Sequence, residues 1–337
     1  MRFLVIGGTQ FIGYAVVQRL AADGHEVAVY NRGVTPAELP EGVRRITGDR
    51  AGIAEARSVF ASFQPDAVLE MRAMCEADAR TTVDALRGST GRVVAISSMD
   101  VYRAFGRIIG TEPGQLEPLP LTEASAVRDR RYPYRSEPPL ASDDPESWRD
   151  SYDKLDVEQV VLNDSELAGT ILRLPMVYGP RDRQHRFRPF VKRMDDGRAV
   201  IPLNDGYANW RSSWSFVDNV AHAIATTMTD ERAAGRIYNV AEQAHPTMAE
   251  IAVELAAIVG WHGEIVELSE ELLAAPLGTA QNLVASGDRI RDELGYVERV
   301  PRAEALLATI EWERSGPPAP GPAEFDYARE DELLARR

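Results

Sequence analysis

The sequence predicts an α/β protein built on a doubly wound parallel sheet, and three observations support this fold class. An apolar run at residues 2–6 leads into Gly7 and Gly8, and apolar residues then recur at helical spacing from Phe11. Further strand-like runs alternate with helical patterns along the first half of the chain. These runs are apolar throughout, as in strands that are buried on both faces of a parallel sheet. Ligands of such folds bind outside the carboxyl ends of the strands.

Each element follows from its local pattern. Strands are expected at 2–6, 27–30, 43–47, 65–69, 93–96, 170–174 and 237–240. Helices are expected from Phe11 to the Gly24 stop and at 54–63, 77–86, 151–167, 187–194, 218–225, 248–259 and 302–312. Thr247 is the expected N-cap of the helix at 248–259, with Glu250 at the capping-box position. The proline-rich stretch 103–150 is expected to be an ordered excursion near the active site, and the tail from Gly316 to pack loosely.

The turn at residues 7–13 is a candidate phosphate-binding site. Glycines allow close approach of the backbone to a pyrophosphate, and the following helix N-terminus offers free N–H groups and the positive end of its dipole. A full Gly-x-x-Gly-x-x-Gly spacing would place glycine at position 10, where this chain has Gln. A plain turn that serves packing is the alternative. The predicted cofactor contacts here are Gly7, Thr9, Gln10, Phe11, Ile12 and Gly13.

The end of the second strand indicates which dinucleotide is bound. A carboxylate that would hold the ribose hydroxyls of NAD is missing, and Asn31 and Arg32 stand there instead. Because an arginine can pair with a 2′-phosphate, NADP is favoured over NAD. Asp49 is placed to accept from the adenine amino group, although a turn-capping Asp would look the same. Arg50 beside it is counted with the cofactor-binding residues.

Composition restricts the function classes. The chain has 337 residues, 44% hydrophobic content and a net charge of −14, which argues against nonspecific binding to nucleic acid or anionic membranes. The single cysteine, Cys75, excludes an intramolecular disulfide and a cysteine-cluster metal site, and it fits a cytoplasmic location. No apolar run is long enough to span a bilayer. His185 has no partner at metal-ligand spacing, so no metal is expected.

The ordered set of motifs resembles the extended and atypical short-chain dehydrogenase/reductase superfamily, in its NAD(P)-dependent epimerase/dehydratase group. The motifs are Gly7–Gly13, Gly48–Asp49, Pro65–Val68, Ser97–Tyr102, Leu121–Glu123, Lys154–Glu158, Arg173–Pro180, Phe216–Asp218, Tyr238–Val240 and Leu294–Tyr296. The resemblance implies a Rossmann-type sheet with a smaller C-terminal substrate-binding domain. The expected division is 1–174 with return segments at about 210–242 for the cofactor domain, and 175–209 with 243–337 for the substrate domain.

The resemblance also implies a catalytic set of Ser, Tyr and Lys, with the tyrosine four residues before the lysine on one helix face. Ser98 and Lys154 match this set, and Ser97 is the weaker serine candidate, counted among the cofactor contacts together with Lys154. The tyrosine does not match, because Asp150 stands four residues before Lys154 and the nearest tyrosine is Tyr152. Either the helix begins irregularly and Tyr152 still reaches the substrate, or another group replaces it, or the usual chemistry is lost. Tyr132, Tyr134, Asp100 and Asp150 are the alternative groups.

Asp100 has a separate interpretation. Dehydratases of the resembled group carry an acidic pair after the serine or threonine, and this chain has Met99 and Asp100 there. A lone Asp at a strand end is otherwise a common turn cap.

Arginines that follow Pro180 suggest an anionic ligand, such as a sugar nucleotide, although a solvated and ion-paired face is an equal alternative. The predicted substrate contacts are Arg181, Arg186, Arg211 and Tyr178, while Pro175 and Val177 are implied to contact the cofactor.

The resemblance further implies a homodimer through the helices at 77–86 and 151–167. The expected function is therefore that of an NAD(P)-dependent epimerase, dehydratase or reductase acting on a sugar nucleotide or a similar hydroxylated substrate. The alternative is a catalytically degenerate dinucleotide-binding sensor or interaction protein.

Overall fold

A seven-stranded parallel sheet forms the centre of the molecule, as predicted. The structure is a computed structural model that describes residues 1–316 and 325–337. The strands stand in the order β10-β6-β5-β4-β1-β2-β3, and every neighbouring pair is parallel. Their bounds are β1 Arg2–Ile6, β2 Glu26–Asn31, β3 Arg44–Thr47, β4 Ala67–Glu70, β5 Arg92–Ser98, β6 Ala168–Leu174 and β10 Ile237–Asn239. The order reverses between β1 and β4, which is where such sheets bind nucleotides.

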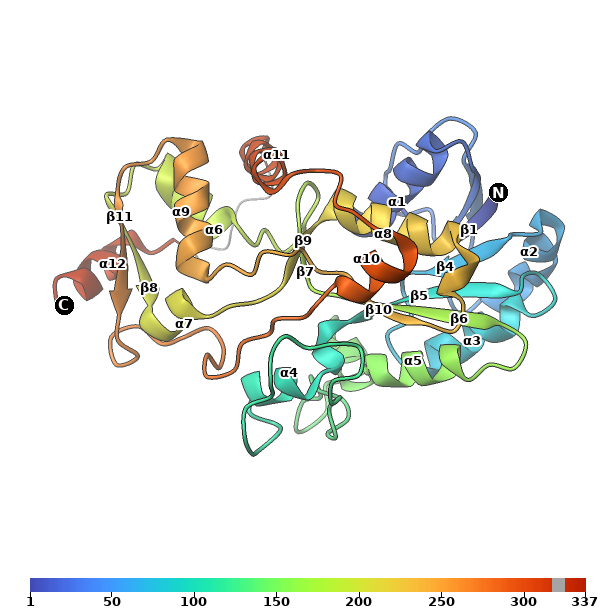
Figure 1. Cartoon of the computed structure of the whole chain (residues 1–337), viewed down its shortest axis with the longest axis horizontal. Helices are drawn as coiled ribbons and strands as arrows, with labels where there is room; N and C mark the ends of the chain where they lie inside the picture. The colour runs from blue at the N-terminus through green and yellow to red at the C-terminus, as the bar shows by residue number, and fades with distance from the viewer. Residues whose placement is uncertain (317–324) are drawn as a thin grey trace.

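Helices cover both faces of this sheet (Figure 1). One face packs against α1 (Phe11–Ala22) and α8 (Val217–Thr229), through residues such as Val17 and Ile224. The other face packs against α2 (Arg57–Phe63), α3 (Glu76–Leu86) and α5 (Lys154–Leu162), through residues such as Phe60 and Val161. The two hydrophobic layers fix the strands, and thereby the edge formed by their carboxyl ends.

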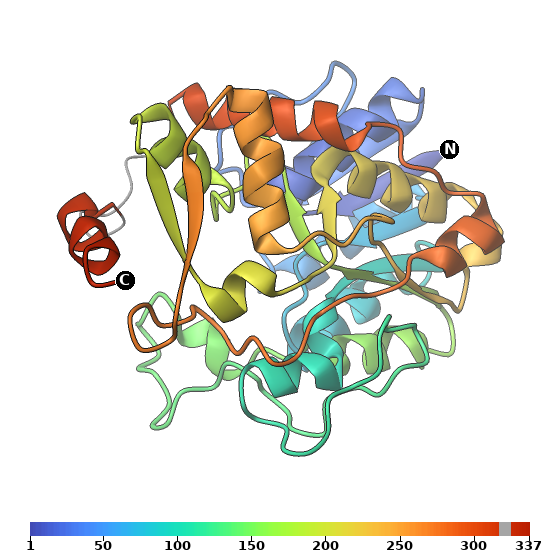
Figure 2. The ribbon, with the colours of Figure 1, turned by 60° about the vertical axis from the view of Figure 1, so that its left-hand side comes forward.

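The remaining elements build the smaller part of the molecule (Figures 1 and 2). Two small parallel sheets pair β7 (Met176–Tyr178) with β9 (Trp214–Phe216), and β8 (Val200–Asn204) with β11 (Glu264–Leu268). The helices of this part are α6 Arg188–Asp195, α7 Asp205–Asn209, α9 Met248–Val259, α11 Arg302–Arg314 and α12 Tyr327–Leu334, whereas α10 Asp288–Leu294 packs against β10 and α8. The capping box predicted for α9 is confirmed, with Thr247 and Glu250 bonding reciprocally.

The excursion after β5 is ordered and largely irregular. It contains α4 (Arg103–Ile108) and ends in a 3₁₀ turn at Ser147–Asp150. The other 3₁₀ turns lie at Ile53–Ala56, Met99–Val101 and Glu231–Ala233. The carboxylate of Glu112 accepts from the backbone N–H of Arg130, and that of Glu123 accepts from Asn239. These bonds tie the excursion to itself and to the sheet.

Two predicted boundaries are wrong. The helix expected at 151–167 spans only Lys154–Leu162, because Asp153 is extended and its side chain caps the helix by accepting from the Leu155 N–H. The tail expected to pack loosely includes α12, whose Leu333 is buried against Val266 and Leu268. Residues 317–324 of that tail lie outside the described residues.

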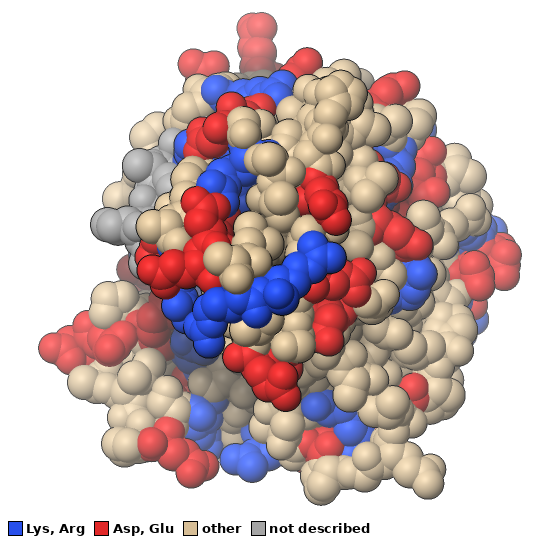
Figure 3. Space-filling view, turned by 90° about the vertical axis from the view of Figure 1, so that its left-hand side faces the viewer, with Lys and Arg blue, Asp and Glu red and all other residues tan. Residues whose placement is uncertain are grey.

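Ion pairs also hold α12 in place. Glu330 pairs with Arg193 and Asp331 pairs with Arg198. Figure 3 shows that basic and acidic side chains are intermixed on this end of the molecule, so its arginines form no uniform basic patch there. Within the described ranges, no helix combines the length and apolar character required to cross a bilayer.

Candidate functional site

A cavity of about 910 Å³ runs along the carboxyl ends of the central strands. Arg32 and Asp49 line one end of it, and Ser98 and Trp148 line the other. The predicted cofactor residues that line it are Gly7, Thr9, Gln10, Phe11, Ile12, Gly13, Asn31, Arg32, Asp49, Arg50, Ser97, Pro175 and Val177. The structure therefore brings thirteen of the fourteen predicted cofactor residues to one elongated cavity. The exception, Lys154, is buried behind it.

The glycine turn has the shape that a phosphate site requires. Gly7 and Gly8 have φ angles of +118° and +87°, which side-chain-bearing residues rarely adopt. A Cβ at Gly13 would lie 2.8 Å from the Gly8 nitrogen, so only glycine allows the helix to approach the turn. Gln10 precedes α1 without capping it through its side chain, which leaves the first N–H groups of the helix available to an anion. The turn therefore fits a dinucleotide pyrophosphate.

Three predicted cofactor residues at the Arg32 end of the cavity differ in the contacts that their side chains already make. Arg32 is exposed and has no ion-pair partner among the described residues. Asp49 caps the next turn by accepting from the Gly52 N–H at 2.8 Å. Arg50 donates to the buried carboxylate of Glu70 at 2.8 Å, so its charge is already balanced. Of these residues, Arg32 is therefore the cation best placed to bind a phosphate.

Lys154 joins the loop after β4 to strand β5. Its Nζ donates to the Ala73 carbonyl at 2.6 Å and to the Ile96 carbonyl at 3.0 Å. Burial lowers the pKa of Lys154 to about 8, while the charges of Asp100 and Glu70 act in the opposite direction. Lys154 therefore holds a costly buried charge directly behind the cavity wall.

Ser97 and Ser98 have different surroundings. Ser97 donates to Glu158 at 2.6 Å, and Glu158 is also paired with Arg173 inside the protein. Both serines line the cavity, and the Ser98 hydroxyl accepts from the backbone N–H of Asp100. The Ser97 hydroxyl is therefore committed to Glu158, whereas the proton of the Ser98 hydroxyl can be donated to a ligand.

Asp100 is the centre of a buried cluster of hydroxyl groups. Tyr152 and Tyr134 both donate to Asp100 Oδ2, at 2.7 and 3.1 Å. Asp100 Oδ1 is buried without a hydrogen-bond partner in the described structure. Burial raises the pKa of Asp100 despite the bond from Tyr152 and the nearby charges of Arg128 and Lys154. Such an environment favours the protonated acid.

The position of Tyr152 follows from the late start of α5. Asp153 has no exposed side-chain surface and pairs with Arg128 at 3.1 Å and with Arg131 at 2.9 Å. Because Asp153 fixes the cap, Tyr152 precedes the helix and its side chain points to Asp100 instead of following the helical spacing. Burial and the charge of Asp100 raise the pKa of Tyr152, while a hydrogen bond with Ser98 lowers it.

Trp148 was missed by the sequence analysis. It lines the cavity with 42% of its surface exposed, and its ring packs edge-on against Tyr152 at 5.7 Å. Tyr152 packs in turn against Tyr134, and Tyr134 against Phe105. An aromatic residue four positions before Tyr152, in a stretch otherwise rich in acidic residues and proline, was the available signal.

The predicted substrate residues are not gathered at the cavity. Arg186 lines it, but its Nη1 lies 2.8 Å from both carboxylate oxygens of Asp182. Arg181 stacks on Tyr14, and Arg211 pairs with Glu250. Tyr178 is buried and donates to Glu242. This placement gives no support to substrate roles for Arg181, Arg211 and Tyr178, and Arg186 is already neutralised.

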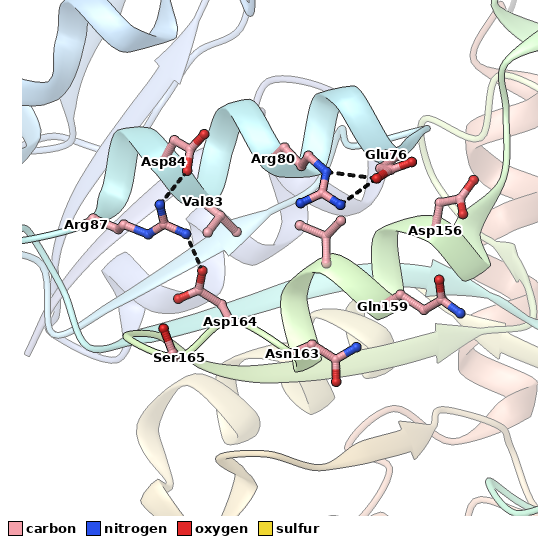
Figure 4. A pocket seen from close by; sticks show the side chains of 11 residues that line it. Glu76, Arg80, Val83, Asp84, Arg87, Asp156, Gln159, Asn163, Asp164 and Ser165 are labelled. Carbon is pink, nitrogen blue, oxygen red and sulfur yellow. Dashed lines mark hydrogen bonds and ion pairs between the residues drawn. The ribbon is translucent and has the colours of Figure 1, made fainter.

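A second groove lies between α3 and α5, on the face expected to form a dimer (Figure 4). Its side chains are mostly polar and pair with one another, as in Arg80 with Glu76 and Arg87 with Asp164. No predicted catalytic or binding residue lines it. Across residues 1–316 and 325–337, no cluster of three or more His, Cys, Asp or Glu has a metal-binding arrangement.

Comparisons with known proteins agree with this fold. The 2′-dehydrokanamycin reductase of Streptomyces kanamyceticus is 28% identical over 94% of this chain and 82% of its own length. The structure of UDP-glucose 4-epimerase from Thermotoga maritima with UDP-glucose matches with a TM-score of 0.70 and 18% identity, covering 94% of this chain and 99% of that one.

UDP-glucose 4-epimerase from Thermus thermophilus, in complex with NAD, matches with a TM-score of 0.68 and 21% identity, covering 94% of this chain and all of that one. The model of the NAD dependent epimerase/dehydratase family matches residues 3–123 and 129–241. With its parallel sheet and its glycine turn, the chain belongs to the NAD dependent epimerase/dehydratase family.

Proposed function

We propose that the protein is an NADP(H)-dependent oxidoreductase that interconverts a carbonyl and a secondary alcohol on a hydroxylated, sugar-like ring. The observation that carries this proposal is Ser98 at one end of a cavity whose other end carries the glycine turn, with Asp100 bonded to Ser98 and Tyr152 bonded to Asp100 in the buried layer directly behind it. The exposed Arg32, with no carboxylate in the ribose position, supports NADP over NAD.

The residues around Asp100 would manage the proton of this reaction. A nicotinamide held in the cavity would supply or accept the hydride. In the reductive direction, Ser98 donates a hydrogen bond to the carbonyl oxygen and Tyr152 Oη gives it a proton. For this step the bond between Tyr152 and Asp100 Oδ2 has to reverse: the acid form of Asp100, which its raised pKa favours, donates to Tyr152 and replaces its proton, and Asp100 regains a proton from solvent between turnovers. This relay avoids a free tyrosinate, which the high pKa of Tyr152 opposes.

The substrate side of the cavity supports a ring held by stacking. Trp148 presents an exposed aromatic surface beside Tyr152. Aromatic faces pack well against the apolar faces of sugars and other rings. Since the predicted arginines are paired or lie elsewhere, the structure favours a substrate that is not bound mainly through a nucleoside diphosphate. The named function of the Streptomyces relative, a reductase of 2′-dehydrokanamycin, points in the same direction.

The cofactor is tested by denaturing the purified protein and identifying any released dinucleotide by mass spectrometry. Retained NADP supports the proposal and the role of Arg32, and retained NAD contradicts the preference for NADP. An empty protein is then titrated with NADPH and NADH. Failure to bind either one would favour a degenerate protein over an enzyme.

The proton relay is tested by comparing Tyr152→Phe with Tyr134→Phe, because both hydroxyls donate to the same oxygen of Asp100. NADPH oxidation is followed with a panel of free and nucleotide-linked keto sugars. Loss of the proton donor should lower kcat by about 10²-fold or more, and Tyr134→Phe should cost less than about tenfold. Full activity of Tyr152→Phe would show that Tyr152 is not the proton donor.

We further propose a homodimer through α3 and α5, which the resemblance implies, with the charged groove of Figure 4 at the interface. Sedimentation velocity at low and high salt tests it, and a monomer at all salt concentrations contradicts it. The cytoplasmic location expected from the lone Cys75 stays a prediction.

A further inference from the structure

The loop at residues 181–186 lies at the cavity and contacts both the start of α1 and the end of α11. It follows β7 and precedes α6, and its Asp182, Arg183, Gln184 and Arg186 line the cavity. Arg181 and His185 have φ angles of +72° and +47°, in the left-handed region that residues with side chains rarely adopt. Surrounding contacts must hold such a conformation in place.

One set of contacts joins the loop to the phosphate-binding turn. Arg183 Nη1 donates to the side-chain oxygen of Gln10 at 3.5 Å, and the guanidinium of Arg181 lies 3.7 Å from the centre of the Tyr14 ring. Arg183 is exposed and forms no ion pair with any carboxylate in the described part of the chain. Its charge is therefore available beside the N-terminus of α1, where a pyrophosphate is expected.

A second set of contacts joins the loop to α11, more than 120 residues away in the sequence. His185 Nδ1 lies 2.9 Å from Glu313 Oε2, and the His185 ring stacks on Trp312 with centroids 5.0 Å apart and planes at 14°. Figure 2 shows α11 running along the smaller part of the molecule beside α9, and it also packs on α6. The loop is thus held from both sides.

The side chain of Glu313 is buried with few polar partners, which is unusual in a helix whose role is only to pack against its neighbours. Its side chain is 2% exposed, and Oε1 has no hydrogen-bond partner in the described structure. Arg188 is the nearest arginine, at 3.9 Å. Burial raises the pKa of Glu313, and its bond with His185 opposes that effect. A buried acid with so little compensation costs stability, which is expected where a residue serves a site.

We infer that residues 181–186 form a clamp through which Arg183 contacts the pyrophosphate of the dinucleotide, and that His185 and Glu313 are positioning residues for this clamp. The inference rests on the proposed dinucleotide-binding function and adds a residue set to it. Arg186 has a different part in the clamp, because its bonds to Asp182 and to the Val177 carbonyl stiffen the loop. The C-terminal helix α11 therefore helps to set the affinity for the cofactor.

Calorimetric titration with two ligands tests the inference. NADP⁺ carries the pyrophosphate, whereas adenosine 2′-monophosphate reaches only the Arg32 end of the cavity. The variants are Arg183→Ala, His185→Ala and Glu313→Ala, with Glu313→Gln as the conservative variant. Glu311→Ala is the matched control, because Glu311 is exposed on the same helix.

The clamp predicts that Arg183→Ala, His185→Ala and Glu313→Ala raise the Kd for NADP⁺ about fivefold or more, as expected for a lost hydrogen bond, and leave the Kd for adenosine 2′-monophosphate unchanged. The double variant of His185 and Glu313 should cost no more than either single variant, because both act through one contact. Glu313→Gln should retain most of the affinity, since its amide oxygen can still accept from His185.

Two results would overturn the inference. One is an unchanged Kd for NADP⁺ in His185→Ala, which also decides the matter if Glu313→Ala does not fold. The other is an equal loss for both ligands, which would indicate general damage to the fold. If the wild-type protein binds no dinucleotide, the proposed function itself fails. Tight wild-type binding with unaffected variants overturns only the clamp.

Discussion

Replacement of Lys154 by methionine should make the protein more stable at neutral pH. Lys154 is 5% exposed and is protonated at pH 7 in both the folded and the unfolded chain. Burial lowers its pKa from 10.5 to about 8. At 1.36 kcal/mol per pH unit, burying the charge costs the folded state about 3 kcal/mol. Methionine fills a similar volume without this cost.

The gain is smaller than the full cost of the charge. Lys154→Met also removes the donor of two hydrogen bonds to the Ala73 and Ile96 carbonyls, and their loss costs about 1–2 kcal/mol together. We therefore expect a net increase of about 1–2 kcal/mol in the free energy of unfolding at pH 7. The variant should bind or use the cofactor less well, because Lys154 anchors the cavity wall.

The difference in free energy of unfolding between Lys154→Met and the wild-type protein should also depend on pH. Between pH 8 and 10.5 the unfolded chain binds a proton at Lys154 that the folded chain has lost, so wild-type stability rises with pH in this window. The advantage of methionine must therefore shrink between pH 7 and pH 9.5. Urea unfolding followed by circular dichroism measures both values.

Lys192→Met is the matched control. Lys192 is partly exposed and pairs with Asp196 on the surface of α6, so its replacement should change stability by less than about 1 kcal/mol. A Lys154→Met protein that is less stable than wild type at pH 7, or a difference that is the same at both pH values, would refute the reasoning.

Two further predictions concern the substrate end of the cavity. Reduction should slow as the pH rises through the raised pKa of Asp100, because only its acid form supplies a proton; Asp100→Asn should remove this limb of the pH–rate profile, and a profile that keeps it would assign the limb to another group. Trp148→Ala should raise KM for the ring substrate about three- to tenfold while the Kd for NADPH stays constant, with Trp148→Phe close to wild type. Equal KM values for all three proteins would mean that the substrate does not stack on Trp148.

The sheet and the glycine turn could be predicted because their signals are local. Buried parallel strands are continuous apolar runs, and the glycines at 7, 8 and 13 are required by backbone conformation and close packing within one βα unit. The capping box of α9 is equally local, since Thr247 and Glu250 are three residues apart. Such features depend little on the rest of the chain.

The cluster of hydroxyl groups around Asp100 could be predicted only in part, because its geometry depends on distant partners. Spacing along a regular helix put Tyr152 on the wrong side of Lys154. The actual start of α5 is set by Asp153, which is satisfied by Arg128 and Arg131 from the preceding excursion. No sequence signal near Tyr152 indicates that the side chain of Arg128 pairs with Asp153 in the folded protein.

The role of the arginines after Pro180 was also hard to predict, because their ion-pair partners cannot be identified from the sequence. As a cluster in the sequence they suggest an anion site, but Arg186 finds Asp182 four residues before it, and Arg188 lies near Glu313 from the far end of the chain. A count of charges in a segment does not reveal which of them are already paired. The C-terminal helix α12 was missed for a related reason, because Leu333 has its apolar partners in β11.

The scarcity of lysine in this arginine-rich chain has a practical consequence. Only Lys154 and Lys192 are present, and they differ sharply in surroundings. Incorporation of lysine labelled with ¹³C at Cε would therefore give a carbon spectrum with two labelled side-chain signals, without chemical modification of the buried amine. The signal from Lys154, which titrates near pH 8, would move when a ligand fills the neighbouring cavity, whereas that from Lys192 would stay fixed. The protein thus carries its own spectroscopic reporter of cofactor occupancy, with an internal reference.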